Sequence, residues 1–198
     1  MASLSSAILP ILPLLAAALL YAAAPANATD LAGLRSGEMR KLVVHEAPVP
    51  VPETEFTAAD GAPTTLAASN GRVRLVNFWA TWCAPCRKEM PALDALQRAK
   101  GGDDFEVITI ATGRNAPEAI AAFREEAGIT DLPNALDPKG RLAAAMGVAG
   151  LPVSVILDRE GGEVARMMGD ADWNGADAHA LIDHLVASDE ASETGVMQ

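Results

Sequence analysis

The sequence predicts an α/β fold, a three-layer sandwich in which a mixed central sheet is flanked by helices. From residue 73 onward, apolar segments of strand length alternate with amphipathic segments of helix length. Residues 73–80 are apolar nearly throughout, as expected of a strand that is covered on both faces. Near the end of the chain, two strand-like segments follow one another around a turn at residues 158–162, which predicts an antiparallel hairpin.

The first elements precede this alternation. Residues 29–44 contain apolar side chains at helical spacing and predict a short amphipathic helix. Prolines alternate with valine over residues 48–52, which predicts an extended linker into the domain. An Asp-Gly pair at residues 60–61 lies between apolar positions and predicts a hairpin turn.

The central part of the chain consists of two buried strands with a helix between them. The strand at residues 73–80 is followed by a helix in which Met90, Leu93 and Leu96 recur at three-residue spacing. A Gly-Gly pair at residues 101–102 ends this helix. The next buried strand is expected at residues 105–111.

Capping residues mark two further helices. Asn115 is expected to cap one helix, with Glu118 at the capping-box position. Asp137 is expected to cap the other, with Pro138 at its first helical position, and this helix should end at Met146.

The chain closes with a hairpin and a helix. Strands are expected at residues 153–157 and 163–167, and a last helix is expected at residues 176–187. The remaining residues, 188–198, are mainly polar and are expected to be disordered.

Length and charge limit the function classes. The chain of 198 residues has a formal net charge of −11 at pH 7, and no charged side chain precedes Asp30. Nucleic acid and anionic membrane surfaces are not expected as partners, because both repel an acidic domain. About 170 residues would remain after removal of a leader, which suits one domain with a sizeable core.

The amino-terminal segment predicts export. Residues 7–24 are apolar and rich in alanine, and residues 26–28 read Ala-Asn-Ala, a signal-peptidase pattern. We therefore expect a signal peptide over residues 1–28, with an uncleaved N-terminal anchor as the alternative. The helix and proline-rich linker then occupy residues 29–52, and the folded domain occupies residues 53–187. Either interpretation places the domain outside the cytoplasm.

The only two cysteines form a C-x-x-C motif directly behind the central strand. Cys83 and Cys86 fall in the first turn of a helix, where two thiols can form a disulfide with little backbone movement. Unpaired N–H groups and the helix dipole favour a thiolate at Cys83. Cys83 is therefore the expected nucleophile, and the more buried Cys86 is expected to resolve the mixed disulfide.

Two alternative roles for the cysteines are less well supported. A zinc site needs four ligands, and neither a second cysteine pair nor a nearby histidine pair is present in the sequence. A purely structural disulfide is the other alternative, but a loop of two residues constrains the unfolded chain little. No metal ligands are therefore predicted, and the redox interpretation is favoured.

The motif and its surroundings resemble the thioredoxin superfamily, and within it the TlpA group of exported reductases. The resemblance covers roughly residues 56–186. It depends on four separated segments: NFWATWCAPCRKEMP at 77–91, ATGRN at 111–115, GLP at 150–152 and GDADW at 169–173. It implies a thioredoxin-like sandwich with an extra β-α element before the strand that follows a cis-proline, and a periplasmic location.

The resemblance also assigns site residues. It suggests that Glu89, one turn after Cys86, handles protons or tunes the thiols; the alternative is an ordinary exposed carboxylate. Asn77 occupies the position at which cytoplasmic thioredoxins have a buried aspartate. Pro152 matches the cis-proline, and the Leu151 backbone is implied to pair with a substrate strand.

Two further residues complete the expected substrate-binding surface. Trp82 lies beside the nucleophile and is expected to shape the docking surface, although tryptophan is more often a packing residue. Pro85 restrains the loop between the cysteines and cannot donate a backbone hydrogen bond. No role is predicted for Asp172 or Trp173.

The sequence thus predicts an exported thiol–disulfide oxidoreductase, and the resemblance implies a reductase of disulfides in proteins that assemble cytochrome oxidase or cytochrome c. A disulfide oxidase or isomerase is one alternative, and a copper-binding assembly factor is another, since two thiolates can bind Cu(I). No cofactor is expected beyond the redox-active Cys83–Cys86 disulfide. The partners that the resemblance implies are an oxidised client protein and a membrane thiol-reductant transporter as electron donor, and the protein itself is expected to be a monomer.

Overall fold

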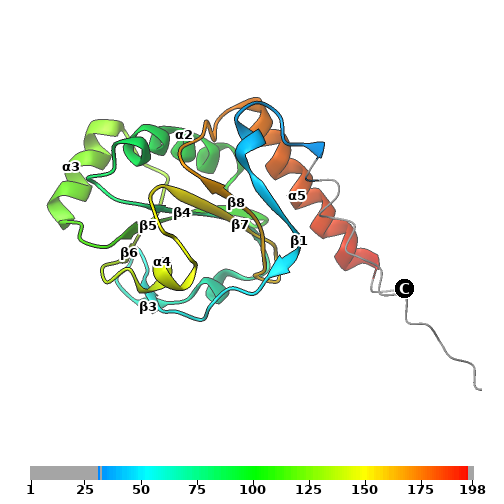
Figure 1. Cartoon of the computed structure of the whole chain (residues 1–198), viewed down its shortest axis with the longest axis horizontal. Coiled ribbons are helices and arrows are strands. Elements are labelled where there is room, and N and C mark those ends of the chain that lie inside the picture. The colour runs from blue at the N-terminus through cyan, green and yellow to red at the C-terminus, as the bar shows by residue number, and fades with distance from the viewer. Residues whose placement is uncertain (1–30, 32, 196–198) are drawn as a thin grey trace, which may run out of the picture.

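The computed structural model describes residues 31 and 33–195, with side chains to residue 188. Its centre is one mixed sheet of eight strands in the order β1-β8-β7-β4-β5-β6-β2-β3. Figure 1 shows this sheet running across the middle of the molecule. The strands are β1 (Val43–Val49), β2 (Phe56–Thr57), β3 (Pro63–Thr64), β4 (Val73–Trp79), β5 (Phe105–Thr112), β6 (Asn134–Asp137), β7 (Val153–Leu157) and β8 (Glu163–Met168).

The central strand β4 determines where the site lies. All seven of its residues are buried. It pairs in parallel with β5 and antiparallel with β7. Because β4 is covered on both faces, its sequence is nearly uniformly apolar rather than alternating. The residues that follow the carboxyl end of β4 therefore lie at the end of the central strands, between β7 and β5.

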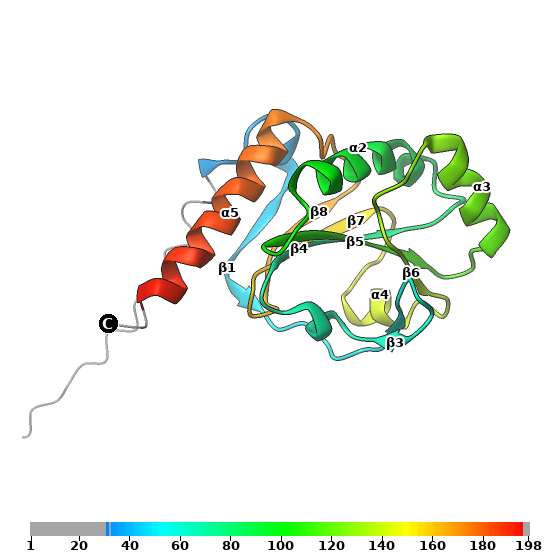
Figure 2. The same ribbon diagram turned by 180° about the vertical axis from the view of Figure 1, so that it is seen from behind.

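Helices cover the two faces of the sheet unequally. The helices α2 (Ala84–Lys100), α3 (Pro117–Ala127) and α5 (Ala176–Gly195) lie on one face, as the view from behind also shows (Figure 2). The short helix α4 (Arg141–Ala145) and the 3₁₀ helix η2 (Leu66–Ser69) cover the other face. The larger core lies under α2, α3 and α5, with Trp79, Leu93, Trp173 and Leu181 fully buried.

The predicted three-layer α/β architecture with a mixed sheet is confirmed. The hairpin around residues 60–61 forms between β2 and β3. The strand β6 and the helix α4 lie between α3 and β7, in the place of the extra β-α element. The C-cap of α2 is Gly101, as predicted, because its backbone N–H bonds back to the Gln97 carbonyl.

The structure differs from the prediction in the amino-terminal segment. Residues 29–30 and 32 lie outside the described residues, and the next element is a 3₁₀ helix, η1 (Gly37–Lys41). Strand β1 replaces the last two residues of the expected helix, 43–44, and the first two residues of the expected linker, 48–49, and it pairs antiparallel with β8. Pro48 made this strand difficult to predict from the sequence, because proline has no backbone N–H to donate to a neighbouring strand. It is tolerated here because β1 is an edge strand.

The two capping predictions were wrong in detail. The N-cap of α3 is Ala116, and no side chain caps it. Asn115 instead accepts a hydrogen bond from the Thr81 backbone N–H at 2.8 Å. Asp137 ends strand β6, and its carboxylate accepts from the backbone N–H groups of Arg141 and Ala143. It therefore does satisfy the first turn of α4, but from the preceding strand.

The two chain ends complete the comparison. Helix α5 continues to Gly195, whereas the prediction ends it at residue 187; no glycine or proline interrupts the segment before Gly195. The expected signal peptide, residues 1–28, lies outside the described residues, as do residues 196–198. Within residues 31 and 33–195, no helix combines the length and hydropathy needed to cross a bilayer.

Candidate active site

The two cysteines lie at the carboxyl end of β4, where the chain enters α2. Cys83 is the N-cap residue of α2 and Cys86 lies in its first turn. Their sulfur atoms are bonded at 2.02 Å, with 5.3 Å between the Cα atoms. The predicted Cys83–Cys86 disulfide is therefore formed in this structure.

The helix start distinguishes the two sulfur atoms. The Cys86 backbone N–H donates to Cys83 Sγ at 3.3 Å, so the Cys83 sulfur occupies the capping position. Cys83 is 5% exposed and Cys86 is fully buried. An anionic sulfur at the N-cap is stabilised by this N–H group and by the helix dipole. This geometry supports Cys83 as the attacking thiol and Cys86 as the resolving thiol.

The loop before β7, called the proline loop here, contains Leu151 and Pro152 and lies at the same end of the central strands as the cysteines. The Leu151–Pro152 peptide bond is cis, as the resemblance to the thioredoxin superfamily implied. Phe78 pairs with Val153, so Pro152 lies next to the carboxyl end of β4. Leu151 packs against the apolar cluster that contains both cysteines.

An exposed rim surrounds the disulfide. Trp82 is 69% exposed and lies directly before Cys83, and Pro85 is also exposed. Met168, 65% exposed, ends β8 beside the proline loop, since the Gly169 N–H donates to the Pro152 carbonyl. Large apolar side chains that stay in solvent next to a reactive centre are suited to contact a protein partner.

Glu89 is buried, which excludes the interpretation as an exposed helix carboxylate. It is 2% exposed and points from α2 toward the sheet. Its Oε1 accepts from the Asn77 side-chain amide at 2.8 Å. Its Oε2 accepts from the Ala171 backbone N–H at 3.1 Å and from the Trp173 indole N–H at 3.3 Å. The carboxylate is thus held by three donors, from β4 and from the loop before α5.

Burial raises the pKa of Glu89 to about 7, and the three hydrogen bonds oppose this rise without cancelling it. The nearby Asp170 carboxylate raises the pKa of Glu89 further, although Asp170 is itself paired with Lys88 at 2.8 Å. A carboxyl group with a pKa near neutral can accept or release a proton under working conditions. Glu89 therefore has the properties of a general acid–base, one helical turn from Cys86.

The structure reveals functional neighbours that the sequence analysis did not assign. Trp173, for which no role was predicted, donates to Glu89 through its indole. Ser154 lies across from Asn77 in the β4–β7 register and accepts from the same amide group at 2.9 Å. The GDADW segment indicated the Trp173 position, but its partner could be identified only from the folded chain.

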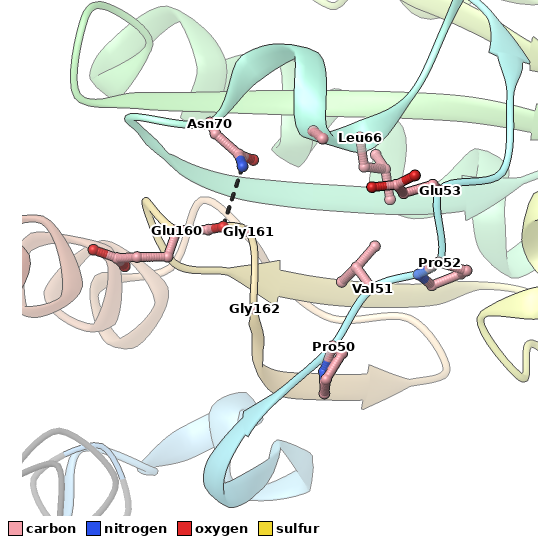
Figure 3. A pocket seen from close by; sticks show the side chains of 10 residues that line it. Pro50, Val51, Pro52, Glu53, Leu66, Asn70, Glu160, Gly161 and Gly162 are labelled. Atoms are coloured by element: carbon pink, nitrogen blue, oxygen red, sulfur yellow. Dashed lines mark hydrogen bonds between the residues drawn. The ribbon is translucent and has the colours of Figure 1, made fainter.

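A cavity of about 280 Å³ lies at the opposite end of the central strand from the cysteines. It lies between the segment after β1, the helix η2 and the turn between β7 and β8, where Asn70 donates to the Glu160 carbonyl (Figure 3). Its lining residues include no cysteine or histidine, so it is separate from the redox site. No cluster of three or more potential metal ligands occurs within the described part of the chain.

Comparison with known proteins gives consistent results. The family model described as Redoxin matches residues 46–182. The thiol:disulfide interchange protein HelX of Rhodobacter capsulatus is 33% identical over 59% of this chain and 60% of its own length. The thioredoxin-like protein YneN of Bacillus subtilis is 33% identical over 56% of this chain and 64% of its own length. The chain therefore spans less than two thirds of these two relatives.

A solved structure extends the comparison to the whole fold. A thiol:disulfide interchange protein of the thioredoxin family from Chlorobium tepidum is 26% identical, with a TM-score of 0.59. The similarity covers 71% of this chain and 97% of that protein. The family model spans both cysteines, the cis-proline and Glu89, and so includes the whole site described above. The chain belongs to the Redoxin family, and its fold is the thioredoxin-like fold of the TlpA-like interchange proteins.

Proposed function

We propose that the protein is a thiol:disulfide oxidoreductase that reduces disulfides in client proteins. The observation that carries this proposal is the placement of Cys83 Sγ at the N-cap of α2, bonded to Cys86 one turn before the buried Glu89. This arrangement supplies the nucleophile, the resolving thiol and a proton acceptor within a single helix. The names of HelX and of the Chlorobium protein support the same reaction class.

The reaction starts from the reduced dithiol. The Cys83 thiolate attacks one sulfur of the client disulfide, which forms a mixed disulfide and releases the client's other sulfur as a thiolate that takes up a proton. The Cys86 thiol then gives its proton to the Glu89 carboxylate. The resulting Cys86 thiolate attacks Cys83 Sγ, forms the Cys83–Cys86 disulfide and releases the second client thiolate. The protein is oxidised by two electrons and the client is reduced by two.

The direction of the reaction depends on the reduction potential. The residues between the cysteines are Ala84 and Pro85, neither of which can donate a side-chain hydrogen bond to the Cys83 thiolate. Less stabilisation of the thiolate corresponds to a more reducing couple. We therefore expect a potential nearer the ~−270 mV of thioredoxin than the ~−120 mV of the oxidant DsbA.

A redox titration of the full chain against glutathione buffers measures this potential directly. A value above about −170 mV would exclude the reductase and favour an oxidase or isomerase. Catalysed reduction of a protein disulfide by the pre-reduced enzyme should accompany the low potential. Neither result should require an added metal or cofactor.

The docking surface for the client is proposed to be the exposed rim. The Leu151 backbone would pair with an extended client segment, while Trp82 and Pro85 would contact its side chains. A Trp82→Ala variant should raise KM for a protein disulfide about tenfold, in the range of interface hot spots. Its rate with a small aromatic disulfide reagent should change much less.

A matched control for Trp82 is available on β1. Val49 is 43% exposed and pairs with Glu163, near the end of the sheet that is remote from the cysteines. Val49→Ser should leave both substrates unaffected. An equal rise in KM for Val49→Ser and Trp82→Ala, or no change in either, would remove Trp82 from the docking surface.

The biological setting is proposed from the resemblance to exported reductases. The apolar segment at residues 7–24 would direct the chain to the periplasm, as a cleaved signal or as an anchor. The clients would be oxidised proteins of cytochrome oxidase or cytochrome c assembly, and a membrane thiol-reductant transporter would return Cys83 and Cys86 to the dithiol. The catalytic unit would be a monomer.

A further inference from the structure

Three polar side chains are buried together between the central strands and α2. Asn77 on β4 and Ser154 on β7 are register partners, and both are at most 1% exposed. Asn77 Nδ2 lies 2.8 Å from Glu89 Oε1 and 2.9 Å from Ser154 Oγ. Both hydrogen atoms of the Asn77 amino group are therefore used, one for each neighbour.

The other end of the same amide is unsatisfied. Asn77 Oδ1 is buried, and it finds no donor among the residues that the structure describes. A buried acceptor without a donor costs free energy, typically about 1–3 kcal/mol. The observed orientation of Asn77 is therefore the one that favours an anionic Glu89, at the expense of its own carbonyl oxygen.

The contacts of Glu89 indicate which of its oxygens takes up a proton. Oε2 already accepts from two N–H groups, those of Ala171 and Trp173. Oε1 accepts only from Asn77. A proton on Oε1 that lies along the line to Asn77 would point at the Asn77 amino group, so that two donors would face one another.

We propose that Asn77 is a positioning residue whose side-chain amide turns over when Glu89 gains or loses its proton, and that the Ser154 hydroxyl pairs with either end of the amide. When Glu89 is anionic, Nδ2 donates to Glu89 and to Ser154. When Glu89 is neutral, Oδ1 takes that place and accepts from the Glu89 Oε1–H and from the Ser154 O–H. A hydroxyl both donates and accepts, so Ser154 serves both states.

This inference rests on the proposed function in one respect, since the proton that reaches Glu89 Oε1 is the one released by the Cys86 thiol. No covalent bond other than S–H and O–H changes in that transfer. The charged groups that interact with Glu89 are Asp170, in the loop before α5, and Lys88, which is paired with Asp170. The strands β4 and β7 contribute the neutral amide and hydroxyl of Asn77 and Ser154.

The Glu89→Gln substitution provides a fixed version of the neutral state. The side-chain carbonyl oxygen of the introduced glutamine would accept from Ala171 and Trp173, which places its amino group toward Asn77. Asn77 must then present Oδ1 at every pH. The variant should therefore lock the amide in the turned orientation, whereas the wild type switches.

The orientation of Asn77 can be followed by NMR of the oxidised full chain with labelled asparagine. Above the midpoint of the Glu89 titration, the Asn77 amino protons should show cross-relaxation with the Ser154 side chain. These contacts should disappear below the midpoint and should be absent throughout in Glu89→Gln. An Asn77 amide whose contacts do not change across the Glu89 titration would overturn the proposal.

Substitutions give a second, independent test. Asn77→Leu removes the donor to anionic Glu89 and should raise the pH midpoint of the Glu89 titration by about one unit, as expected for loss of a hydrogen bond to a charged group. Ser154→Ala should shift the midpoint much less, because the Ser154 hydroxyl pairs with the Asn77 amide in both protonation states of Glu89. Thr109→Val is the control, because Thr109 is the register partner of Asn77 on β5 but donates to the Pro133 carbonyl.

The outcomes separate this proposal from the proposed function. If the midpoint of the Glu89 titration in Asn77→Leu equals that in Thr109→Val, the positioning role of Asn77 is wrong, even where Glu89 still controls disulfide exchange. If the Asn77 amide turns over as Glu89 titrates but the rate of disulfide exchange does not follow that titration, the amide switch is confirmed. The proposed proton transfer from Cys86 to Glu89 is then wrong. The NMR measurement on the wild type decides the question even if Asn77→Leu does not fold.

Discussion

A Cys86→Ala variant should accumulate as a covalent adduct with its client, joined through Cys83. The variant keeps the sulfur at the N-cap of α2, which is the one that the backbone N–H of residue 86 stabilises. It loses the only thiol that lies within one helical turn and can attack the mixed disulfide. Exchange should therefore proceed through its first half and then stop, with turnover falling to the uncatalysed background.

The adduct can be isolated from cells under non-reducing conditions, and mass spectrometry of the linked peptides then identifies both cysteines and the client. Cys83→Ala is the matched control, because Cys86 is fully buried and should form no adduct. Equal trapping by the two variants would show that the nucleophile was assigned to the wrong sulfur.

Replacing Glu89 with glutamine should abolish the dependence of stability on pH that the Glu89 carboxyl causes. Burial raises the pKa of Glu89 from 4.5 to about 7, so the folded protein favours the neutral form. A raised carboxyl pKa contributes stability that is fully present below pH 4.5 and is lost as the pH rises through 7. In the wild type this loss should be on the order of 3 kcal/mol. Glutamine has no proton to lose, so the variant should be more stable than the wild type at about pH 8.5.

The measurement is urea unfolding of the oxidised wild type and of Glu89→Gln at about pH 5.5 and about pH 8.5, because the disulfide form has no titrating thiol. Glu118→Gln is the control, since Glu118 is exposed on α3, and it should follow the wild type. The prediction fails if the difference in unfolding free energy between the wild type and Glu89→Gln is the same at both pH values. The buried carboxyl would then ionise like a carboxyl in water.

The same substitution should slow disulfide exchange. Loss of a general acid–base typically costs a factor of about 10²–10⁴, so resolution by Cys86 should fall about a hundredfold near neutral pH. The fold is retained because glutamine can keep the bonds from Ala171 and Trp173. An unaltered pH–rate profile in Glu89→Gln would assign the carboxyl group a structural role only.

The sequence was sufficient for the elements with strong local patterns. The central strand, the helix after the motif and its end at Gly101, and the strands at residues 153–157 and 163–168 were predicted within a residue or two. Each has either a continuous apolar segment or a clear start and end residue. The two cysteines and the cis-proline were likewise predicted, because their roles depend on short motifs.

The remainder depended on contacts between distant residues. Strand β1 exists because its backbone pairs with β8, and no local pattern indicates that pairing across its proline. Asn115 is a residue type that often caps helices, yet its side chain accepts hydrogen bonds from the backbone N–H and the hydroxyl of Thr81. The burial of Glu89 is determined by Trp173, which lies 84 residues further along the chain. Spacing within one helix could place Glu89 near Cys86 but could not show what encloses it.

The enclosure of Glu89 also bears on the order in which the site is assembled during synthesis. The cysteine motif leaves the ribosome long before residues 169–173, which hold the carboxylate through the Ala171 and Trp173 N–H groups. Until those residues dock, Glu89 lies in water with the acidity of an ordinary glutamate. On the proposed mechanism, a partly folded chain therefore has both thiols but lacks the tuned proton acceptor, so full reactivity would be acquired only when the end of the domain has packed.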